Sequence, residues 1–305
     1  MCSSDLVGIA LPPLGALIRP YFAETVIGLL LLAFLRVDPG ALRAQWREPR
    51  LLLVAAVWTM LIQPVLALGM LAGTMHLIGG AFPASLALAL VLHAVAPPTF
   101  SSPSLATLIG LNGAISLAVL IACTAITPLT SPALVAAFFG SEVSLSPLAL
   151  GLRLVLILAG AALTALAIRA VAGKAWVERQ AERLDGLSVL MLFGFAIVLM
   201  GDVLPNTLTQ PLLVLGLIAL STSVSVALTA ATALAFLLSG REAAFTLGHT
   251  SGSRNMGLML AAASAGSAPE FVWLYVALAQ FPIYLLPLLY KPLVRRLMPR
   301  QDASP

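Results

Sequence analysis

Charged residues are scarce in this chain. Of its 305 residues, 9% are charged and 60% are hydrophobic, and the mean hydropathy is +1.05. A soluble domain usually carries about 25% charged residues, so a chain of this composition has too little polar surface to cover itself in water. The scarcity of charge therefore excludes an ordinary soluble globular protein.

The chain also lacks the residues that several kinds of functional site require. Its two cysteines, Cys2 and Cys123, offer neither a disulfide framework nor metal-ligand spacing. The sequence contains no Cys/His set with metal-ligand spacing and no glycine-rich phosphate-binding loop, which excludes an ATP-driven pump formed by this chain alone. We expect no resident metal, no cofactor and no enzymatic activity.

Long apolar segments dominate the sequence instead. Runs of about 20 apolar residues, rising about 1.5 Å per residue, cross a hydrocarbon core about 30 Å thick. The sequence therefore predicts an all-α polytopic protein of the lipid bilayer. Ten spans are predicted, at residues 6–19, 23–36, 50–74, 82–108, 112–138, 147–172, 186–204, 210–239, 241–265 and 269–297.

The basic residues predict an orientation for these spans. All but three of the 16 Lys and Arg residues fall in the loops 36–50 and 169–185, in the turn near residue 241, or after residue 290. Short cytoplasmic loops are enriched in Lys and Arg, so the pattern predicts a multi-pass protein of the cell (inner) membrane with both termini in the cytoplasm. The net charge of +4 reflects these loops and indicates no nucleic-acid partner.

Ten spans divide into two sets of five, residues 1–138 and 139–305. An odd number of spans per half gives the halves opposite orientations, as in the inverted repeats of secondary transporters. The fourth span of each half is interrupted near its middle. The first interruption, in "LALALVLHAVAPPTFSSPSLATLIG", contains Pro97, Pro98 and Pro103; the second, in "FTLGHTSGSRNMGLML", contains Gly248 and Gly252.

Unwound backbone at membrane depth is tolerated only where it is buried in protein or lines a cavity. Two broken helices at matching places therefore predict a transport site. The alternative is a pair of kinked helices whose serines bond to their own carbonyls. The candidate substrate ligands are the polar residues of the interruptions, Thr99, Ser101, Ser102, His249, Thr250, Ser251, Ser253, Arg254 and Asn255.

The sequence allows two different roles for each of the candidate histidines and for Asn255. His93 and His249 precede the interruptions at corresponding places and would either carry a proton between the two faces or be hydrogen-bonded packing residues. Asn255 would either contact the substrate or cap the second half-helix.

These stretches resemble the bile acid:sodium symporter family, within the bile/arsenite/riboflavin transporter superfamily. The resemblance covers most of the chain and includes "DPGALRAQWREPRLLLVAAVWTMLIQPVLAL" and "PPTFSSPSLATLIGLNGAISLAVL". "TSGSRNMGL" matches the family pattern Glu-x-Gly-x-Gln-Asn-x-x-Leu at Gly252, Asn255 and Leu258. The resemblance implies a core domain of helices 3–5 and 8–10, a panel domain of helices 1, 2, 6 and 7, broken helices 4 and 9 that cross in the core, and substrate entry between the domains.

The sodium ligands that the resemblance implies are only partly present. This chain has Thr250 where the family motif has Glu, and Arg254 where the motif has Gln. In the fourth helix it has Ser102 and Pro103 where the family has a Ser-Asn pair. Of two fifth-helix hydroxyl positions, Ser116 keeps its oxygen and Leu120 does not. A helix-three glutamine corresponds to Thr59, with Gln63 displaced next to Pro64. The candidate ion ligands are therefore Ser102, Ser116, Thr250 and Thr59.

Sodium binding is disfavoured at such a site. Two like charges about 4 Å apart repel by roughly 4 kcal/mol at an effective dielectric of about 20. A guanidinium at position 254, without the family's carboxylate at position 250, argues against conventional two-sodium coupling.

Arg254 needs compensation, because an arginine at helix-centre depth costs ~2.5–3.5 kcal/mol on insertion scales. It would pair with a carboxylate (Glu24, Asp202 or Glu270), donate to carbonyls of the unwound fourth span in place of sodium, or bind the carboxylate, sulfate or phosphate of a substrate. The last two roles can coexist.

The sequence thus predicts a secondary active transporter that moves a small organic anion by alternating access. One alternative is a conventional sodium-dependent organic anion symporter with rearranged ligands. A more remote one is a non-transporting membrane sensor, or an intramembrane hydrolase using Ser251 or Ser253 near His249. The sequence indicates no oligomeric state.

Overall fold

The computed structural model describes residues 12–36, 49–78, 83–139, 146–263 and 268–297, and most of these residues are helical. In those ranges the one β-type feature is an isolated bridge between two loops. The predicted all-α class is confirmed. Seven described segments are long and apolar enough to cross a membrane: Pro13–Arg36, Pro49–Thr74, Gly113–Phe138, Pro147–Ala172, Ala181–Thr209, Pro211–Ala235 and Glu270–Leu297.

The spans predicted at 6–19 and 23–36 are not separate in the described residues. α2 (Pro12–Ile18), a 3-10 turn at Arg19–Tyr21 and α3 (Phe22–Arg36) follow one another directly and together have the length of one crossing. Arg19 lies at the end of the first of these predicted spans and is one of the three basic residues outside the basic loops, but its charge is accommodated within the helical segment. Its guanidinium lies 3.4 Å from an Asp202 carboxylate oxygen and 4.3 Å from the centroid of the Trp273 ring. Residues 6–11 lie outside the described ranges, and ten spans are not confirmed.

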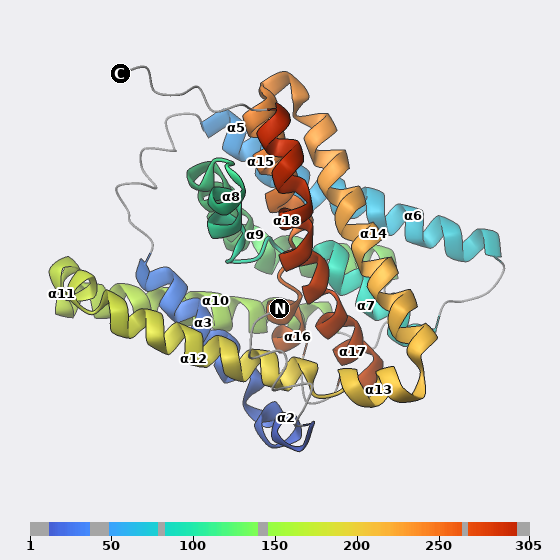
Figure 1. Cartoon of the computed structure of the whole chain (residues 1–305), viewed down its shortest axis with the longest axis horizontal. Helices are drawn as coiled ribbons and strands as arrows, with labels where there is room; N and C mark the ends of the chain where they lie inside the picture. The colour runs from blue at the N-terminus through green and yellow to red at the C-terminus, as the bar shows by residue number, and fades with distance from the viewer. Residues whose placement is uncertain (1–11, 37–48, 79–82, 140–145, 264–267, 298–305) are drawn as a thin grey trace.

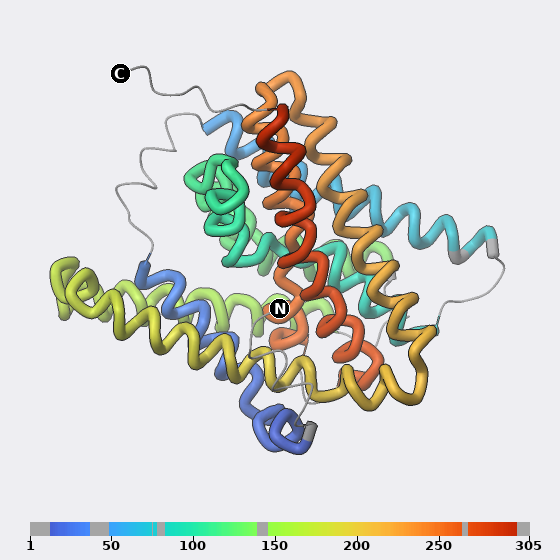
Figure 2. Tube along the Cα trace, in the orientation of Figure 1, coloured from blue at the N-terminus to red at the C-terminus, as the bar shows by residue number. Residues whose placement is uncertain are grey.

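Two groups of helices can be followed in Figure 1 and along the trace in Figure 2. In the first group, α3 packs against α10 (Pro147–Ala172) and α12 (Ala181–Met200), which the short α11 (Lys174–Arg179) connects. α2 packs on α12, and α13 (Val203–Thr209) follows α12 toward the second group.

The second group is built around three helices. α14 (Pro211–Ala235) packs along α15 (Arg241–Gly252), and α15 packs on α9 (Gly113–Phe139). α5 (Pro49–Val57), a π turn at Trp58–Ile62 and α6 (Gln63–Ile78) form one long segment beside α9. α17 (Glu270–Leu278) and α18 (Gln280–Leu297) pack on α14.

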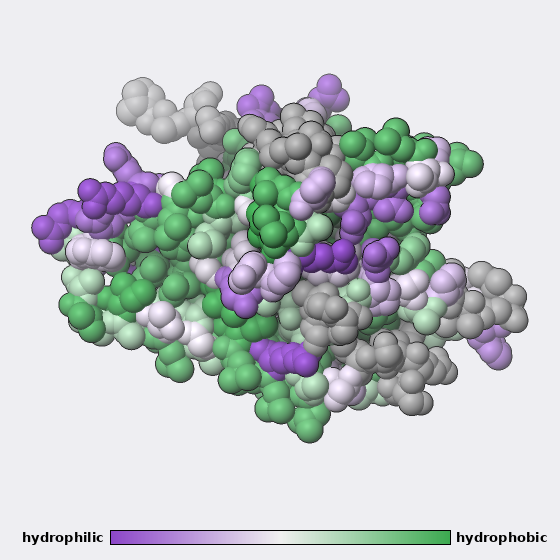
Figure 3. Space-filling model, turned by 90° about the horizontal axis from the view of Figure 1, so that it is seen from below, coloured by the Kyte–Doolittle hydropathy of each residue, from purple (hydrophilic) through white to green (hydrophobic). Residues whose placement is uncertain are grey.

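The outer surface carries many large apolar side chains, which form wide hydrophobic areas in Figure 3. On α10, for example, Leu152, Leu156 and Leu163 are each more than half exposed. Apolar surface of this extent is incompatible with contact with water and is explained by contact with lipid. The chain is a multi-pass membrane protein.

Two of the predicted spans are each divided into two short helices. Span 82–108 contains α7 (Ala84–Val95) and α8 (Ser102–Ile109), and span 241–265 contains α15 and α16 (Met256–Ala262). We call residues 96–101 the first break and residues 253–255 the second break. The structure confirms that both predicted spans are interrupted.

Gly248 and Gly252 do not produce the second break, as their positions suggested. Both lie inside α15, where the helix approaches α14 closely. A Cβ at Gly248 would lie 2.8 Å from the Thr229 carbonyl oxygen, and one at Gly252 would lie 2.8 Å from the Ser225 carbonyl oxygen. The two glycines therefore allow two backbones to pack together, a common use of small residues four apart in membrane helices.

Candidate functional site

The two breaks cross and bond to each other through their main chains. The Thr99 N–H donates to the Ser253 carbonyl at 2.8 Å, and the Asn255 N–H donates to the Pro97 carbonyl at 2.7 Å. These bonds flank the bridge between Pro98 and Arg254. Each break thus satisfies backbone groups of the other at membrane depth, as unwound backbone there requires. The alternative of two merely kinked helices is wrong.

The Arg254 guanidinium lies inside the protein, and the residue is 1% exposed. Nη1 donates to the Ala96 carbonyl at 2.7 Å and to the Thr59 carbonyl at 3.2 Å, and Nη2 donates to Oε1 of Gln63 at 2.5 Å. These partners are all uncharged. Among the described residues no ion pair to Arg254 is formed, so the ion-pair interpretation is wrong there. The expected bond to a carbonyl of the interrupted fourth span is present.

Proline leaves both carbonyls available to the guanidinium. In the π turn, the Gln63 N–H bonds to the Trp58 carbonyl instead of the Thr59 carbonyl, and the next residue, Pro64, has no N–H. Ala96 follows the last residue of α7 and precedes Pro97, which disfavours the α conformation at Ala96; with ψ 143° the residue is extended, and its carbonyl leaves the direction of the helix. Two prolines in different spans therefore create acceptors that meet one arginine from a third segment.

Gln63 belongs to the site, although the sequence analysis assigned the corresponding family position to Thr59. Its Oε1 accepts from Arg254 and from the Ser251 hydroxyl at 2.6 Å, and its Nε2 donates to the Leu228 carbonyl at 2.7 Å and to the Thr232 hydroxyl at 3.0 Å. The amide is thereby fixed with its oxygen toward the guanidinium. Thr59, which we aligned with the family's glutamine, contributes its main-chain carbonyl.

Three of the four candidate ion ligands, Ser102, Ser116 and Thr250, lie close together near the breaks. Oγ1 of Thr250 lies 2.7 Å from Oγ of Ser116, which lies 3.4 Å from Oγ of Ser102, and all three residues are fully buried. Thr250 also lies within 2.8 Å of the Thr246 carbonyl of its own helix. The hydroxyls bond mainly to one another, with no carboxylate among their bonded partners in the described residues.

The two histidines are buried and each has one hydrogen-bond partner. Nδ1 of His93 lies 2.9 Å from the Tyr275 hydroxyl, and Nε2 of His249 lies 3.2 Å from the Ser102 carbonyl. A carbonyl only accepts, so the His249 ring carries a proton on Nε2. Both contacts are consistent with the interpretation that the histidines are hydrogen-bonded packing residues. A role in proton coupling stays a prediction.

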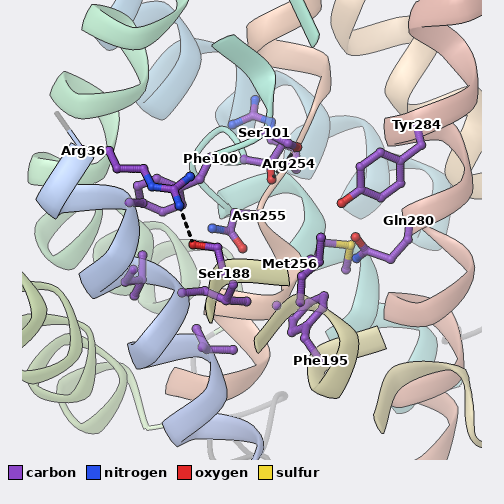
Figure 4. Close-up of a pocket in the computed structure, with 17 residues that line it drawn as sticks. Arg36, Phe100, Ser101, Ser188, Phe195, Arg254, Asn255, Met256, Gln280 and Tyr284 are labelled. Atoms are coloured by element: carbon purple, nitrogen blue, oxygen red, sulfur yellow. Dashed lines mark hydrogen bonds between the residues drawn. The ribbon is translucent and has the colours of Figure 1, made fainter. Parts of the chain in front are cut away.

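A cavity of about 220 Å³ lies between the breaks and the first group of helices (Figure 4). From the breaks and the start of α16 it is lined by Thr99, Phe100, Ser101, Arg254, Asn255, Met256 and Gly257. α3 and α12 form the opposite wall, and α18 contributes Gln280 and Tyr284. Of the predicted substrate ligands, Thr99, Ser101, Arg254 and Asn255 thus lie at the cavity. Ser102, His249, Thr250, Ser251 and Ser253 do not line it.

Asn255 combines the two roles that its position suggested. Its Oδ1 accepts from the Leu258 N–H at 3.0 Å and caps α16. The residue also faces the cavity (Figure 4), so its amide nitrogen can reach a bound molecule there.

Arg36 is a cavity residue that the sequence placed only at the edge of a basic loop. It ends α3, and its guanidinium extends toward the cavity (Figure 4). Nη2 lies 2.5 Å from Oδ1 of Asp185 and donates to the Ser188 hydroxyl at 3.1 Å. Among the described residues, the cavity lining thus contains two arginines and no acidic residue.

No protein-family model and no curated protein matches the chain. The resemblance to bile acid:sodium symporters therefore stays a prediction from the quoted motifs.

Proposed function

We propose that this membrane protein is a secondary transporter that moves a small organic anion by alternating access, without sodium as the coupling ion. One observation carries the proposal: where the interrupted helices cross, a buried guanidinium is bonded to two main-chain carbonyls and a side-chain amide oxygen, with no carboxylate among its partners in the described ranges.

Such a set of oxygens is what a hard alkali cation takes as ligands. In this chain Arg254 supplies the positive charge permanently, so the crossing of the breaks needs no ion from solution. A sodium ion about 4 Å from the guanidinium would meet a repulsion of roughly 4 kcal/mol at an effective dielectric of about 20. The resemblance to sodium symporters then extends to the architecture and not to the coupling ion.

The cavity lining favours an anionic substrate. In the part of the chain that the structure describes, it contains Arg36 and Arg254 and no acidic residue. The cavity also includes Ser101, which directly precedes α8, and Met256 and Gly257 in the first turn of α16, and helix N-termini carry a partial positive charge that favours anions. Thr99, Ser101 and Asn255 add uncharged groups that can orient the bound molecule.

The position of the cavity supports alternating access. Its walls come from both groups of helices, and rocking of one group against the other would open it first to one side of the membrane and then to the other. We place the basic loops in the cytoplasm. Because Pro13–Arg36 has the length of a single crossing, the start of α2 then faces the outer side, in contrast to the cytoplasmic N-terminus predicted with ten spans.

Counterflow in proteoliposomes tests the proposal. Purified protein is reconstituted with an internal panel of carboxylates and sulfonates, and exchange is followed in sodium and in choline buffers. We expect exchange at the same rate in both. A rate that requires sodium would support the conventional symporter instead, and no exchange of any anion would favour the sensor or hydrolase alternative.

A further inference from the structure

Arg36 lies between two cavities. It lines the cavity at the breaks, and it also lines a second cavity of about 270 Å³ together with Arg169, Lys174 and Asp185. The second cavity is formed where α3 ends beside α11 and the first turns of α12. A molecule that passes from one cavity to the other would pass this guanidinium.

The two arginines of the first cavity differ in what their guanidinium groups can bind. The partners of the Arg254 guanidinium, at Thr59, Gln63 and Ala96, do not line the cavity, and the residue is 1% exposed. The side chain of Arg36 is 39% exposed and points toward the cavity in Figure 4. Of these two, Arg36 is the one that a substrate carboxylate can reach without dismantling the crossing of the breaks.

The ion pair of Arg36 is suited to exchange. Its partner Asp185 has a side chain that is 63% exposed, so the carboxylate can return to water when it leaves the guanidinium. Exposed ion pairs contribute little stability, and a planar guanidinium binds an incoming carboxylate through two parallel hydrogen bonds. Glu178, the other acidic residue that lines the second cavity among the described residues, has a carboxylate oxygen 3.6 Å from Nζ of Lys174.

We propose that Arg36 is the substrate-anion ligand of this transporter and that Asp185 competes with the substrate for it. The inference rests on the proposed function. A substrate carboxylate displaces Asp185 from the Arg36 guanidinium as it binds, and Asp185 returns as the anion leaves. Ser188 holds the guanidinium at the cavity wall during the exchange.

Binding to purified protein tests the proposal, with acetate, butyrate, benzoate, 2-naphthoate and benzenesulfonate as probes and benzamide as the uncharged control. For each anion that the unmodified protein binds, Arg36→Gln should raise the Kd about tenfold, as expected for loss of one charge-assisted hydrogen-bonded contact. Asp185→Asn should lower it about threefold by removing the competitor. Benzamide binding should respond to neither change.

Two control variants separate a ligand from a structural ion pair. Arg183→Gln removes a neighbouring arginine that lines neither cavity and should leave anion binding unchanged. The exchange variant Arg36→Asp/Asp185→Arg keeps an ion pair but places a carboxylate on α3, so anion binding should stay weak.

Three outcomes would overturn the proposal. If Arg36→Gln binds the anions as tightly as the unmodified protein, Arg36 is not the ligand, although the transporter proposal stands. If the exchange variant restores full affinity, the pair is structural. If the unmodified protein binds none of the five anions, both the ligand assignment and the proposed function fail.

Discussion

At the scale of single residues, the central feature is a buried arginine stabilised by uncharged partners. The acceptors of Arg254 come from three places: a π turn, the end of a half-helix and the side chain of Gln63. Oriented dipoles at Nη1 and Nη2 offset part of the desolvation of this charge, while Nε has no hydrogen-bond partner among the described residues. We propose that the arginine permanently takes the place that a cation from solution would otherwise occupy among these oxygens.

The double variant Thr250→Glu/Arg254→Gln should therefore gain a response to sodium. It removes the fixed charge and returns a carboxylate to α15, near the Ser102 and Ser116 hydroxyls. We expect sodium chloride, but not choline chloride, to raise its apparent Tm in detergent. Arg254→Gln alone is the matched control. It should lose about 2–4 kcal/mol of stability, because two buried carbonyls lose their donor, with little recovery in sodium. Equal Tm values for the double variant in both salts would contradict the idea that Arg254 replaces a cation.

The sequence was sufficient to identify Arg254 and both breaks but not Gln63. Prolines in the first break and a cluster of polar residues in the second are local signals, and each predicts an interruption without knowledge of the rest of the chain. Thr59 and Gln63 lie one turn apart on the same segment, so sequence alone does not tell which one reaches the arginine. The structure uses both, one through its main chain and one through its side chain.

At the scale of helices, Pro64 affects the site through the backbone conformation, although its own side chain does not contact Arg254 through a hydrogen bond. Its missing N–H favours the π turn, which leaves the Thr59 carbonyl to Arg254. The role of the glycines in α15 was likewise hidden in the sequence, because a glycine at a break and a glycine at a close helix contact look the same without the partner helix.

Pro64→Ala should destabilise the protein, although alanine is the better helix former. With an N–H at position 64 the turn can become α-helical, the Gln63 N–H then bonds to the Thr59 carbonyl, and Arg254 loses an acceptor. We expect a loss of about 1–2 kcal/mol, the scale of one buried hydrogen bond, seen as a lower apparent Tm. The control is Pro292→Ala in α18, where an exposed proline lies within a helix and its removal should be neutral or stabilising. An increase in Tm for Pro64→Ala would show that the π turn has no part in holding the arginine.

Gly252→Ala should separate α15 from α14. The new methyl group would lie 2.8 Å from the Ser225 carbonyl oxygen and would also clash with the Thr229 side chain. Overpacking of this kind costs typically about 1–3 kcal/mol, measurable as a fall in apparent Tm. Gly216→Ala, on α14 with open space around the added methyl, should be neutral or slightly stabilising. Similar Tm values for the two variants would mean that the contact between α14 and α15 adjusts freely.

At the scale of the whole molecule, the cavity lies where two groups of helices meet. α16, which follows α15 of the second group, packs on α3 and α10 of the first, and Gly257 at the start of α16 faces Phe195 of α12. The apolar pattern of the sequence predicted most of the spans. It did not separate the first group from the second, because both present apolar faces to lipid and to each other.

Gly257→Ala should slow transport more than it lowers stability. A Cβ there would lie 2.7 Å from the Phe195 ring, so the ring must shift within the cavity wall. We expect slower anion counterflow at a nearly unchanged Tm, with recovery in the double variant Gly257→Ala/Phe195→Leu, which shortens the facing side chain. Gly194→Ala on the same helix as Phe195, with open space around it, is the control. Unchanged counterflow in Gly257→Ala would indicate that this contact does not bear on the transport cycle.

Equilibrium binding of ²²Na⁺ to the purified protein tests the account most directly, because it needs no knowledge of the substrate. A fixed guanidinium at the crossing of the breaks predicts no saturable binding at millimolar sodium, with or without an organic anion present. Saturable binding of one or two sodium ions per chain, competed by unlabelled sodium and not by choline, would contradict it.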